Sequence, residues 1–277
     1  MGALQILTPA GGLPAAGGDD YVFEREALAS IDAEIVECPA TPDAFIAAAA
    51  SADAVYAKGM KFTAPMIAAL ARCRVITLGS VGVDYVDVAA ATARGIPVTN
   101  CPDTFIEEVA DHAMMLLLAT HRRAIEQDRM VREGRWAEGR PQLSRVPRLM
   151  GSTLGFVSFG RVARAVARRA RPFGLRMMAF DPFVDENAIG EAGVEPTSLA
   201  EVLAQSDFIS SHLPATADTR GFLSESHFRQ MKKGAIFINT GRGPTVDETA
   251  LIKALREGWI AGAGLDVLET EPPKPDN

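Results

Sequence analysis

Residues 155–163, GFVSFGRVA, have the residue spacing of a phosphate-binding turn between a β-strand and an α-helix. Of the three glycines that such a turn usually carries, only the middle one is kept, as Gly160. Ser158 and Ala163 stand at the other two positions. Alanine is an accepted substitute at the third position, whereas serine at the first is strained if the turn requires a positive φ. The stretch predicts a dinucleotide site, and the alternative is a purely structural strand–helix turn.

Asp181 ends the next predicted strand, 18 residues after Ala163. A carboxylate there can accept a hydrogen bond from the ribose 2′ hydroxyl and repels a 2′ phosphate, so it favours NAD over NADP. No arginine follows it in DPFVDEN. The backbone amides of Arg161 and Val162, at the start of the helix, would receive the phosphates. The alternative for Asp181 is an ordinary residue that caps a turn before Pro182.

Short β-type runs alternate with helical patterns along the whole chain, which is typical of parallel sheets covered by helices. The first part of the chain contains five predicted strands, at 4–8, 33–38, 52–58, 74–80 and 96–100. The second part contains five more, at 154–159, 176–180, 207–212, 234–239 and 262–267. We therefore expect an α/β protein with two doubly wound parallel-sheet domains, 1–103 and 104–277.

A single long helix is predicted between the two sets of strands, from about Glu107 to Glu133, ending at Gly134. Its apolar residues lie on more than one face, which indicates burial against a second domain or subunit. The polar, proline-bearing stretch 134–150 then leads to the second set of strands as a connection.

The composition limits the classes of protein to which the chain can belong. A chain of 277 residues with 48% hydrophobic content can bury the cores of two domains. Its net charge of −7 disfavours binding to nucleic acid or an anionic membrane. The three cysteines lack the close spacing of a metal site, so we expect reduced thiols and no metal. The N-terminus lacks the pattern of a signal peptide and the apolar run 113–119 is too short to cross a bilayer, so a cytoplasmic protein is expected.

The chain resembles the D-isomer-specific 2-hydroxyacid dehydrogenases over nearly all of its length. Four blocks carry the resemblance: GSVGVDYVDVAAATARGIPVTNCPD (79–103), GFVSFGRVARAVARRARPFG (155–174) with Asp181, HLPATADTRGFL (212–223), and the long block 234–273 that contains NTGRG and ETEPP. The resemblance implies a flavodoxin-like substrate domain and a Rossmann-like NAD-binding domain, with the active site in the cleft between them. It also implies hydride transfer between NAD and C2 of a small D-2-hydroxy or 2-oxo acid, in a homodimer built partly on the long helix.

The resemblance assigns roles to residues on the substrate side. Arg242 matches the catalytic arginine, whose planar fork can hold a carboxylate with two parallel hydrogen bonds. Glu271 matches the glutamate that pairs with the catalytic histidine and raises the pKa of that histidine, and Glu269 is the weaker match. The amides around Val81 and Gly82 match the loop that receives the substrate carboxylate.

The resemblance also implies the cofactor contacts. Asp266 matches the residue that holds the nicotinamide carboxamide. The other cofactor-binding residues are Ser158, Gly160, Arg161, Val162, Asp181, His212, Leu213, Pro214, Thr219, Thr240 and Gly241.

The acid–base group and two residues carry open alternatives. The family's catalytic histidine follows the glutamate by some tens of residues, and none of the four histidines here lies beyond Glu271. We therefore expect the 277-residue chain either to be truncated relative to the family or to belong to a protein that no longer catalyses, and in both cases to show little or no turnover. His112, on the apolar helix, is expected to be a packed structural residue. Lys58 lies where family members place substrate-selecting side chains, and a solvated lysine is the alternative.

Two hypotheses about function follow. The chain belongs either to an NAD-dependent dehydrogenase or to a noncatalytic NAD-binding protein that acts through protein partners. Retention of Arg242, Glu271 and the GSVGVD loop favours the enzyme, because a binding module does not need all three. The substrate can be lactate-, glycerate- or hydroxypyruvate-, glyoxylate- or phosphoglycerate-like, since all present the same carboxylate and C2 oxygen.

Overall fold

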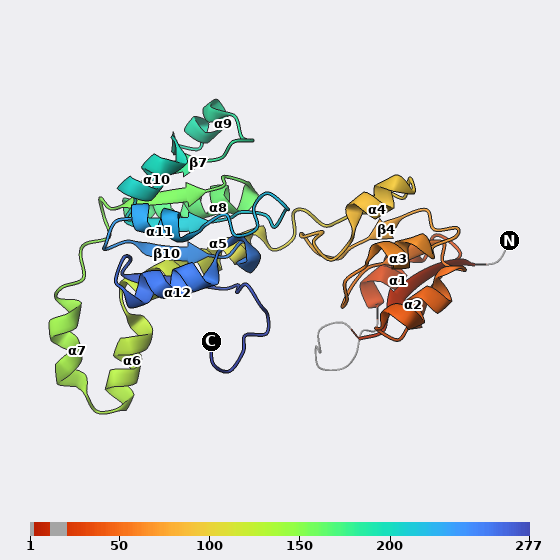
Figure 1. Cartoon of the computed structure of the whole chain (residues 1–277), viewed down its shortest axis with the longest axis horizontal. Coiled ribbons are helices and arrows are strands. Elements are labelled where there is room, and N and C mark those ends of the chain that lie inside the picture. The colour runs from red at the N-terminus through yellow and green to blue at the C-terminus, as the bar shows by residue number, and fades with distance from the viewer. Residues whose placement is uncertain (1–2, 12–20) are drawn as a thin grey trace. The chain divides into compact units, whose positions relative to one another are not determined.

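The computed structural model of the chain describes residues 3–11 and 21–277 (Figure 1). The chain divides into two compact units, Met1–Thr104 (unit 1) and Phe105–Asn277 (unit 2). No helix in the described parts of the chain is long and apolar enough to cross a membrane.

Unit 1 is built on a parallel sheet that has five strands within the described residues, in the order β2-β1-β3-β4-β5. This order is the flavodoxin-like arrangement that the resemblance implies. Its strands are β1 (Leu4–Pro9), β2 (Ala33–Cys38), β3 (Ala54–Tyr56), β4 (Ile76–Thr77) and β5 (Val98–Thr99). Its helices are α1 (Val22–Leu28), α2 (Pro42–Ala49), α3 (Ala64–Ala68) and α4 (Val88–Ala93).

Short local signals and a few large apolar side chains fix unit 1. Pro42 stands in the first turn of α2, where its missing N–H costs no hydrogen bond. The Thr41 hydroxyl caps the same helix by accepting a hydrogen bond from the Ala44 amide at 3.4 Å. Phe45 of α2 packs edge to face against Phe62, with ring centroids 5.1 Å apart, and both rings are fully buried.

Unit 2 is built on a six-stranded parallel sheet in the order β11-β10-β9-β6-β7-β8. Numbered from β6 as strand 1, this is the Rossmann-like order 6-5-4-1-2-3. The first three strands are added toward one side of the sheet and the last three toward the other, so the strand order reverses between β6 and β9. The strands are β6 (Thr153–Val157), β7 (Arg176–Phe180), β8 (Glu195–Pro196), β9 (Phe208–Ser211), β10 (Ile236–Asn239) and β11 (Gly262–Leu265).

Helices cover both faces of this sheet, as a doubly wound fold requires. Ile236 and Ile238 of β10 join the core that α5 (Ile106–His121) and α8 (Arg161–Ala170) form on one face. Phe237 joins the core on the opposite face, which includes side chains of α10 (Leu199–Gln205), α11 (Glu225–Gln230) and α12 (Glu248–Arg256). The short helix α9 (Glu186–Glu191) lies between β7 and β8 in the chain.

The prediction of one helix over 107–133 is wrong. Helix α5 ends at His121, Arg123 adopts a left-handed conformation with φ 53°, and a second helix, α6, spans Ala124–Arg132. The break separates two different surfaces: α5 buries Ala110, Met114 and Leu117 against the sheet, whereas α6 buries only Met130. The apolar face therefore ends with α5, and the chain turns before the mainly polar α6 begins.

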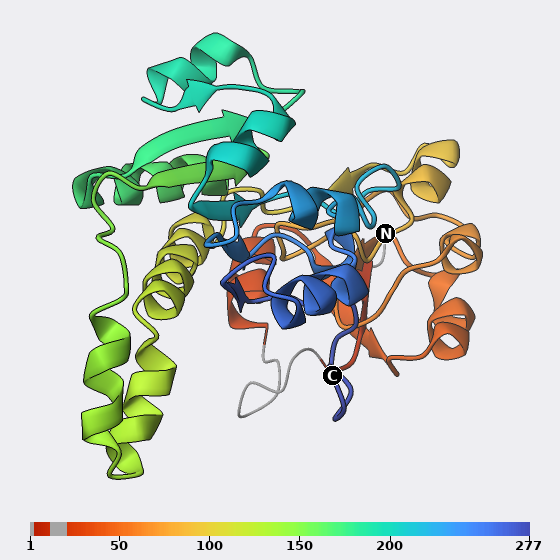
Figure 2. The same cartoon turned by 60° about the vertical axis from the view of Figure 1, so that its left-hand side comes forward.

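The stretch 134–150 is also more than the connection that was predicted. It contains a third helix, α7 (Trp136–Leu143), with Pro141 inside it. Figures 1 and 2 both show α6 and α7 side by side, projecting from the sheet of unit 2. We call residues 124–143 the helical hairpin.

Candidate active site

The predicted site residues of unit 2 lie on loops at one edge of its sheet. All the strands are parallel, so the loops that follow them leave from the carboxyl edge, where ligands bind in open α/β sheets. A Cβ added to Gly243 would lie 1.7 Å from the Leu268 carbonyl oxygen, so the loops after β10 and β11 are in close contact. The loops carry residues 158–160, 181, 212–214, 240–242 and 266–271, Arg161 and Val162 begin α8, and Thr219 follows in the same segment as 212–214.

The turn after β6 has the conformation of a phosphate-binding turn despite its serine. Ser158 has φ 72°, in the left-handed region that glycine adopts without strain, so the strain expected of serine there is present. Gly160 precedes α8, and a Cβ added to it would meet nothing within 4 Å. Ala163 is fully buried in the core against the sheet, where a small side chain allows close helix–strand packing.

The N-terminus of α8 has the properties of an anion-binding site. No side chain caps it, and its first turn contains no acidic residue. Amides that are not satisfied within a helix, together with the helix dipole, favour a phosphate group at such an end. The backbone around Arg161 and Val162 therefore fits the pyrophosphate of a dinucleotide.

Asp181 accepts three hydrogen bonds, two of them from this turn. Its Oδ2 accepts from the Phe159 amide at 2.8 Å and from the Ser158 hydroxyl at 3.1 Å. Its Oδ1 accepts from the Phe183 amide at 2.9 Å. The turn-capping alternative for Asp181 is thus realised through Phe183, and the same carboxylate lies beside the turn where a dinucleotide site requires it.

Arg242 and the glutamates lie on the adjoining loops after β10 and β11. The Arg242 carbonyl accepts hydrogen bonds from the Thr245 hydroxyl at 2.6 Å and from Nδ2 of the Asn239 side chain at 3.3 Å, which fixes the backbone that carries the guanidinium. Glu271 accepts a hydrogen bond from the Leu268 amide at 2.8 Å. Glu269 is engaged with the start of α12, because its amide donates to Glu248 at 2.8 Å.

The structure corrects the expectation for His112. Its side chain is 41% exposed, and its Nε2 lies 3.2 Å from Oδ1 of Asp266, the residue assigned to the nicotinamide carboxamide. His121 is the packed histidine of the same helix, 6% exposed and edge to face with Phe208. Sequence periodicity could not separate the two, because the pairing depends on where α5 crosses β11.

His212 lies in the loop after β9 that the resemblance assigns to the cofactor. Its Nε2 lies 2.9 Å from the Ser210 hydroxyl, and burial lowers the pKa of His212 to about 4. The next residue, Leu213, is 9% exposed, and its carbonyl lies close to Gly241, where an added Cβ would approach within 3.0 Å. These contacts hold the 212–214 loop against the loop after β10.

In unit 1, Val81 and Gly82 follow β4. The Val81 carbonyl accepts a hydrogen bond from the Asn100 side chain at 2.6 Å, and the Gly82 carbonyl accepts one from the Ser80 hydroxyl at 2.9 Å. With both carbonyls held, the orientation of the loop's peptide groups is fixed.

Lys58, after β3, is not the solvated lysine of the alternative reading. Its ammonium donates to the Tyr21 hydroxyl at 2.7 Å and lies 4.2 Å from the centroid of the same ring. Tyr21 in turn donates to Glu37 at 2.5 Å.

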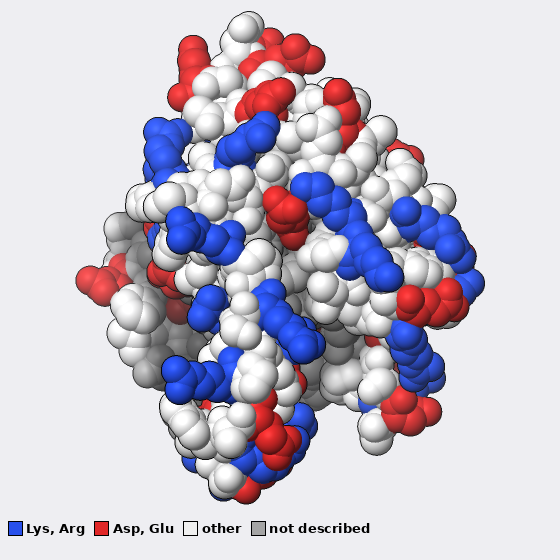
Figure 3. Space-filling view, turned by 90° about the vertical axis from the view of Figure 1, so that its left-hand side faces the viewer, with Lys and Arg blue, Asp and Glu red and all other residues white. Residues whose placement is uncertain are grey.

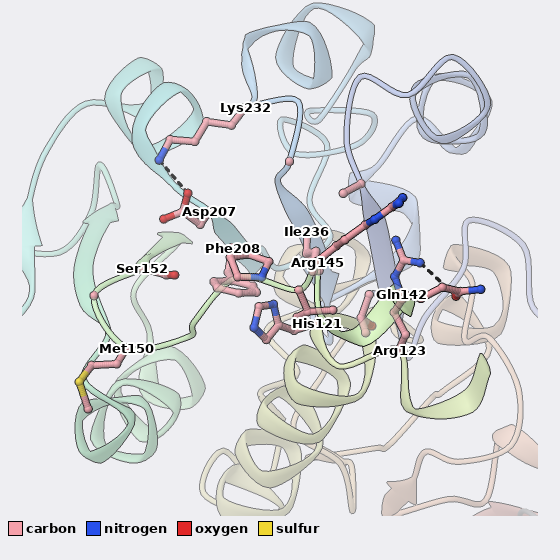
Figure 4. Close-up of a pocket in the computed structure, with 16 residues that line it drawn as sticks. His121, Arg123, Gln142, Arg145, Met150, Ser152, Asp207, Phe208, Lys232 and Ile236 are labelled. Carbon is pink, nitrogen blue, oxygen red and sulfur yellow. Dashed lines mark hydrogen bonds and ion pairs between the residues drawn. The ribbon is translucent and has the colours of Figure 1, made fainter. Parts of the chain in front are cut away.

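A cavity of about 500 Å³ lies at the opposite, amino edge of the unit 2 sheet, next to the residues at which the helical hairpin begins and ends (Figure 4). In Figure 4, Lys232 is paired with Asp207, and His121 lies beside Phe208. Figure 3 shows the side of the molecule on which the hairpin lies, with basic side chains spread across its middle and acidic ones among and around them. The cavity contains no predicted cofactor or substrate residue, and its position before the strands differs from that of ligand sites in open α/β sheets.

Comparisons with known proteins converge on one family. Residues 114–277 match the model described as D-isomer specific 2-hydroxyacid dehydrogenase, NAD binding domain. A glyoxylate reductase of Korarchaeum cryptofilum is 46% identical over 215 residues, which cover 77% of this chain and 65% of that protein.

Solved structures agree. The crystal structure of a glyoxylate reductase from Paecilomyes thermophila has a TM-score of 0.85 at 30% identity and covers 99% of this chain and 84% of its own. D-lactate dehydrogenase from Aquifex aeolicus, complexed with NAD and lactic acid, has a TM-score of 0.81 at 29% identity, with coverage of 96% and 78%.

The chain belongs to the family of D-isomer-specific 2-hydroxyacid dehydrogenases, and unit 2 contains the NAD-binding domain of that family. The predicted pair of doubly wound, parallel-sheet domains is confirmed. The match spans 65% of the length of the Korarchaeum relative.

Proposed function

We propose that the protein is an NAD-dependent oxidoreductase that interconverts a small 2-oxo acid and its D-2-hydroxy acid, with glyoxylate as the first substrate to test. Its relatives include proteins named glyoxylate reductase, which supports this choice. The observation that carries the proposal is the single sheet edge that gathers the uncapped α8 N-terminus, Asp181, Arg242 and Asp266.

The residues of unit 2 fit the cofactor. The α8 amides would bind the pyrophosphate, Asp181 the adenine-side ribose and Asp266 the carboxamide, with the 212–214 loop, Thr219, Thr240 and Gly241 beside it. When bound, NAD would supply the hydride acceptor for C2 of the hydroxy acid while an acid–base group takes the hydroxyl proton, and NADH would supply the hydride for the reverse reaction. The carboxylate of Asp181 repels a 2′ phosphate, so we propose a preference for NAD(H) over NADP(H).

The substrate is held through its carboxylate. We propose unit 1 as the substrate domain, in which the Val81 and Gly82 amides accept the carboxylate. Arg242 binds the substrate through its rigid fork of donors, which also stabilises negative charge at the C2 oxygen. Glu271 is the proposed partner of the acid–base group, because an ionised carboxylate stabilises a protonated neighbour. None of the four histidines of this chain is assigned as the acid–base group itself.

The test is a titration with NADH and NADPH followed by an assay of NADH oxidation with glyoxylate, hydroxypyruvate and pyruvate. The proposal expects tighter binding of NADH and oxidation that depends on the 2-oxo acid. Absence of NADH binding would contradict the cofactor assignment. Binding by the complete product of the gene without turnover of any 2-oxo acid would contradict the enzymatic one, because the acid–base group is not assigned within this chain.

We also propose that the protein is a homodimer whose interface includes the helical hairpin. Ile125, Val131 and Trp136 are 79%, 53% and 71% exposed on a projecting element that buries little of its own surface. Light scattering should give twice the chain mass for the parent and for Phe23→Asp, an exposed position on α1, but the chain mass for Trp136→Asp. Equal masses for all three proteins would contradict this interface.

The three cysteines are free thiols, which supports a cytoplasmic location.

A further inference from the structure

We propose that His112 is a positioning residue for the cofactor. Through its contact with one oxygen of the Asp266 carboxylate, it keeps the other oxygen directed at the amino group of the nicotinamide carboxamide. The inference rests on the proposed function, because it assumes that Asp266 receives that carboxamide when NAD(H) is bound. It gives helix α5 a part in orienting the nicotinamide.

Asp266 has a fixed backbone but a side chain that is free to turn. It follows β11 at the carboxyl edge of the sheet, and its amide donates to the Asn239 carbonyl of β10 at 3.0 Å. Its side chain is 43% exposed, so core packing does not hold it. The terminal torsion of an aspartate is broad and has no sharply preferred angle. The direction of the carboxylate must therefore be set by a contact with another side chain.

Helix α5 supplies that contact because it crosses β11 at close range. Gly264 of β11 has no side chain, and a Cβ added there would lie 3.0 Å from the Cβ of Leu116 and 3.1 Å from the Thr120 hydroxyl oxygen. The helix therefore packs directly on the strand that leads into Asp266. His112, about two turns before Thr120 on the same helix, is brought beside the carboxylate by this packing.

The pair engages one of the two carboxylate oxygens. Nε2 of His112 lies 3.2 Å from Oδ1 of Asp266, within the range of N–H···O contacts. An ionised carboxylate only accepts, and two facing lone pairs would repel, so Nε2 carries a hydrogen in this contact. Among the residues that the structure describes, no other group bonds this carboxylate. Oδ2 is therefore open to a donor from a ligand.

A carboxamide needs one oxygen in one direction. Its amino group can be satisfied by a single acceptor, so the oxygen that removal of His112 would free adds nothing to binding. What the histidine contributes is direction, because a carboxylate that is already held loses less freedom when a ligand binds. The two side chains are 41% and 43% exposed, so their pairing adds little to the stability of the fold. Its effect belongs to the binding of the carboxamide.

The test compares His112→Leu, His112→Gln and the control Met115→Leu by fluorescence titration with NADH and with its acetylpyridine analogue. Leucine removes the nitrogen, whereas the amide of glutamine can place a donor near the same point. Met115 lies about one turn further along α5 and is 46% exposed. Thermal melting shows that each variant is folded.

The analogue separates a contact made through Asp266 from a contact with the ring itself. It keeps the ring and the carbonyl of nicotinamide but carries a methyl group in place of the amino group, so it has no hydrogen to donate to the carboxylate. Titrations of Asp266→Ala and of the double variant His112→Leu/Asp266→Ala complete a double-mutant cycle, which shows whether the histidine acts through the aspartate.

We expect His112→Leu to bind NADH about two- to fivefold more weakly than the parent and to bind the analogue equally well, with His112→Gln and Met115→Leu close to the parent. Without the aspartate, the leucine substitution should have no effect. Four results would overturn the inference and leave the proposed function intact: parental NADH binding in His112→Leu, equal weakening of both cofactors, no recovery in His112→Gln, or a loss that persists in the double variant.

Two results would reach further. Parental NADH binding in Asp266→Ala would overturn the inference together with the assignment of Asp266 to the carboxamide. A parent chain that binds neither cofactor would contradict the proposed function as well.

Discussion

Gly243→Ala tests whether the loops after β10 and β11 must touch for the site to form. The new methyl group would lie 1.7 Å from the Leu268 carbonyl oxygen and 2.0 Å from its carbon. Both are backbone atoms, so no side-chain rotation relieves the clash. The loop that carries Asp266 and Glu271 must move by about 1.3 Å to reach the 3.0 Å at which real Cβ contacts begin.

The magnitude follows from the forced displacement. Overpacking of this kind costs about 1–3 kcal/mol, which for a domain of this size lowers the melting temperature by roughly 2–12 °C. A shift of about 1 Å in catalytic groups can cost about a hundredfold in rate. We therefore expect lower stability, weaker NADH binding and a large loss of kcat/KM with glyoxylate.

Gly190→Ala is the matched control, because the same methyl group at Gly190 in α9 would meet nothing within 4 Å. It should melt at or slightly above the parent temperature, since alanine is the better helix former. Circular dichroism melts and NADH titrations of the three proteins provide the comparison. If Gly243→Ala matched the parent in melting temperature, NADH affinity and rate, the close packing of the two loops would be refuted.

Three further predictions concern single residues. Arg242→Lys keeps the charge but loses the bidentate fork, so kcat/KM should fall about ten- to a hundredfold with NADH affinity unchanged, and a fully active variant would exclude the assigned role. His212 has a pKa of about 4 in the folded chain and an ordinary value near 6.5 when unfolded, so its contribution to stability, roughly 3 kcal/mol at most, is present above pH 6.5 and is lost as the pH falls toward 4. Urea unfolding at pH 7 and pH 4.5 should show a smaller loss in His212→Asn than in the parent, and equal losses would contradict the burial of a neutral imidazole. Asp181→Ala should reduce the ratio of NADPH to NADH dissociation constants to near one, whereas an unchanged ratio would show that Asp181 does not discriminate.

The sheet edge at which the candidate residues lie can be predicted from the sequence, because it depends on strand order alone. Buried parallel strands are nearly continuous apolar runs, so a segment such as 234–239 is visible in the sequence. Once the strands are known, every loop that follows one lies at the carboxyl edge. The two-residue strand β8 could not be predicted, because Glu195 and Pro196 lack the run of apolar residues that indicates a buried strand.

Features that depend on packing between distant segments could not be predicted. Arg122 and Arg123 are good helix formers, and the break between α5 and α6 arises from the difference between a buried and a polar helix. The pairing of His112 with Asp266 depends on the path of α5 across the sheet, and that of Lys58 with Tyr21 joins residues 37 positions apart. The sequence predicts candidate residues for the site but not the contacts that orient them.

Hydrogen–deuterium exchange with and without NADH tests the central claim most directly, because it distinguishes the carboxyl edge of the unit 2 sheet from the cavity at the opposite edge. The account predicts slower exchange in the carboxyl-edge loops of unit 2, at 156–162, 178–183, 210–214 and 239–243. It predicts no change around the amino-edge cavity, at 145–152 and 230–234. Protection of the cavity segments with no change in the carboxyl-edge loops would contradict it.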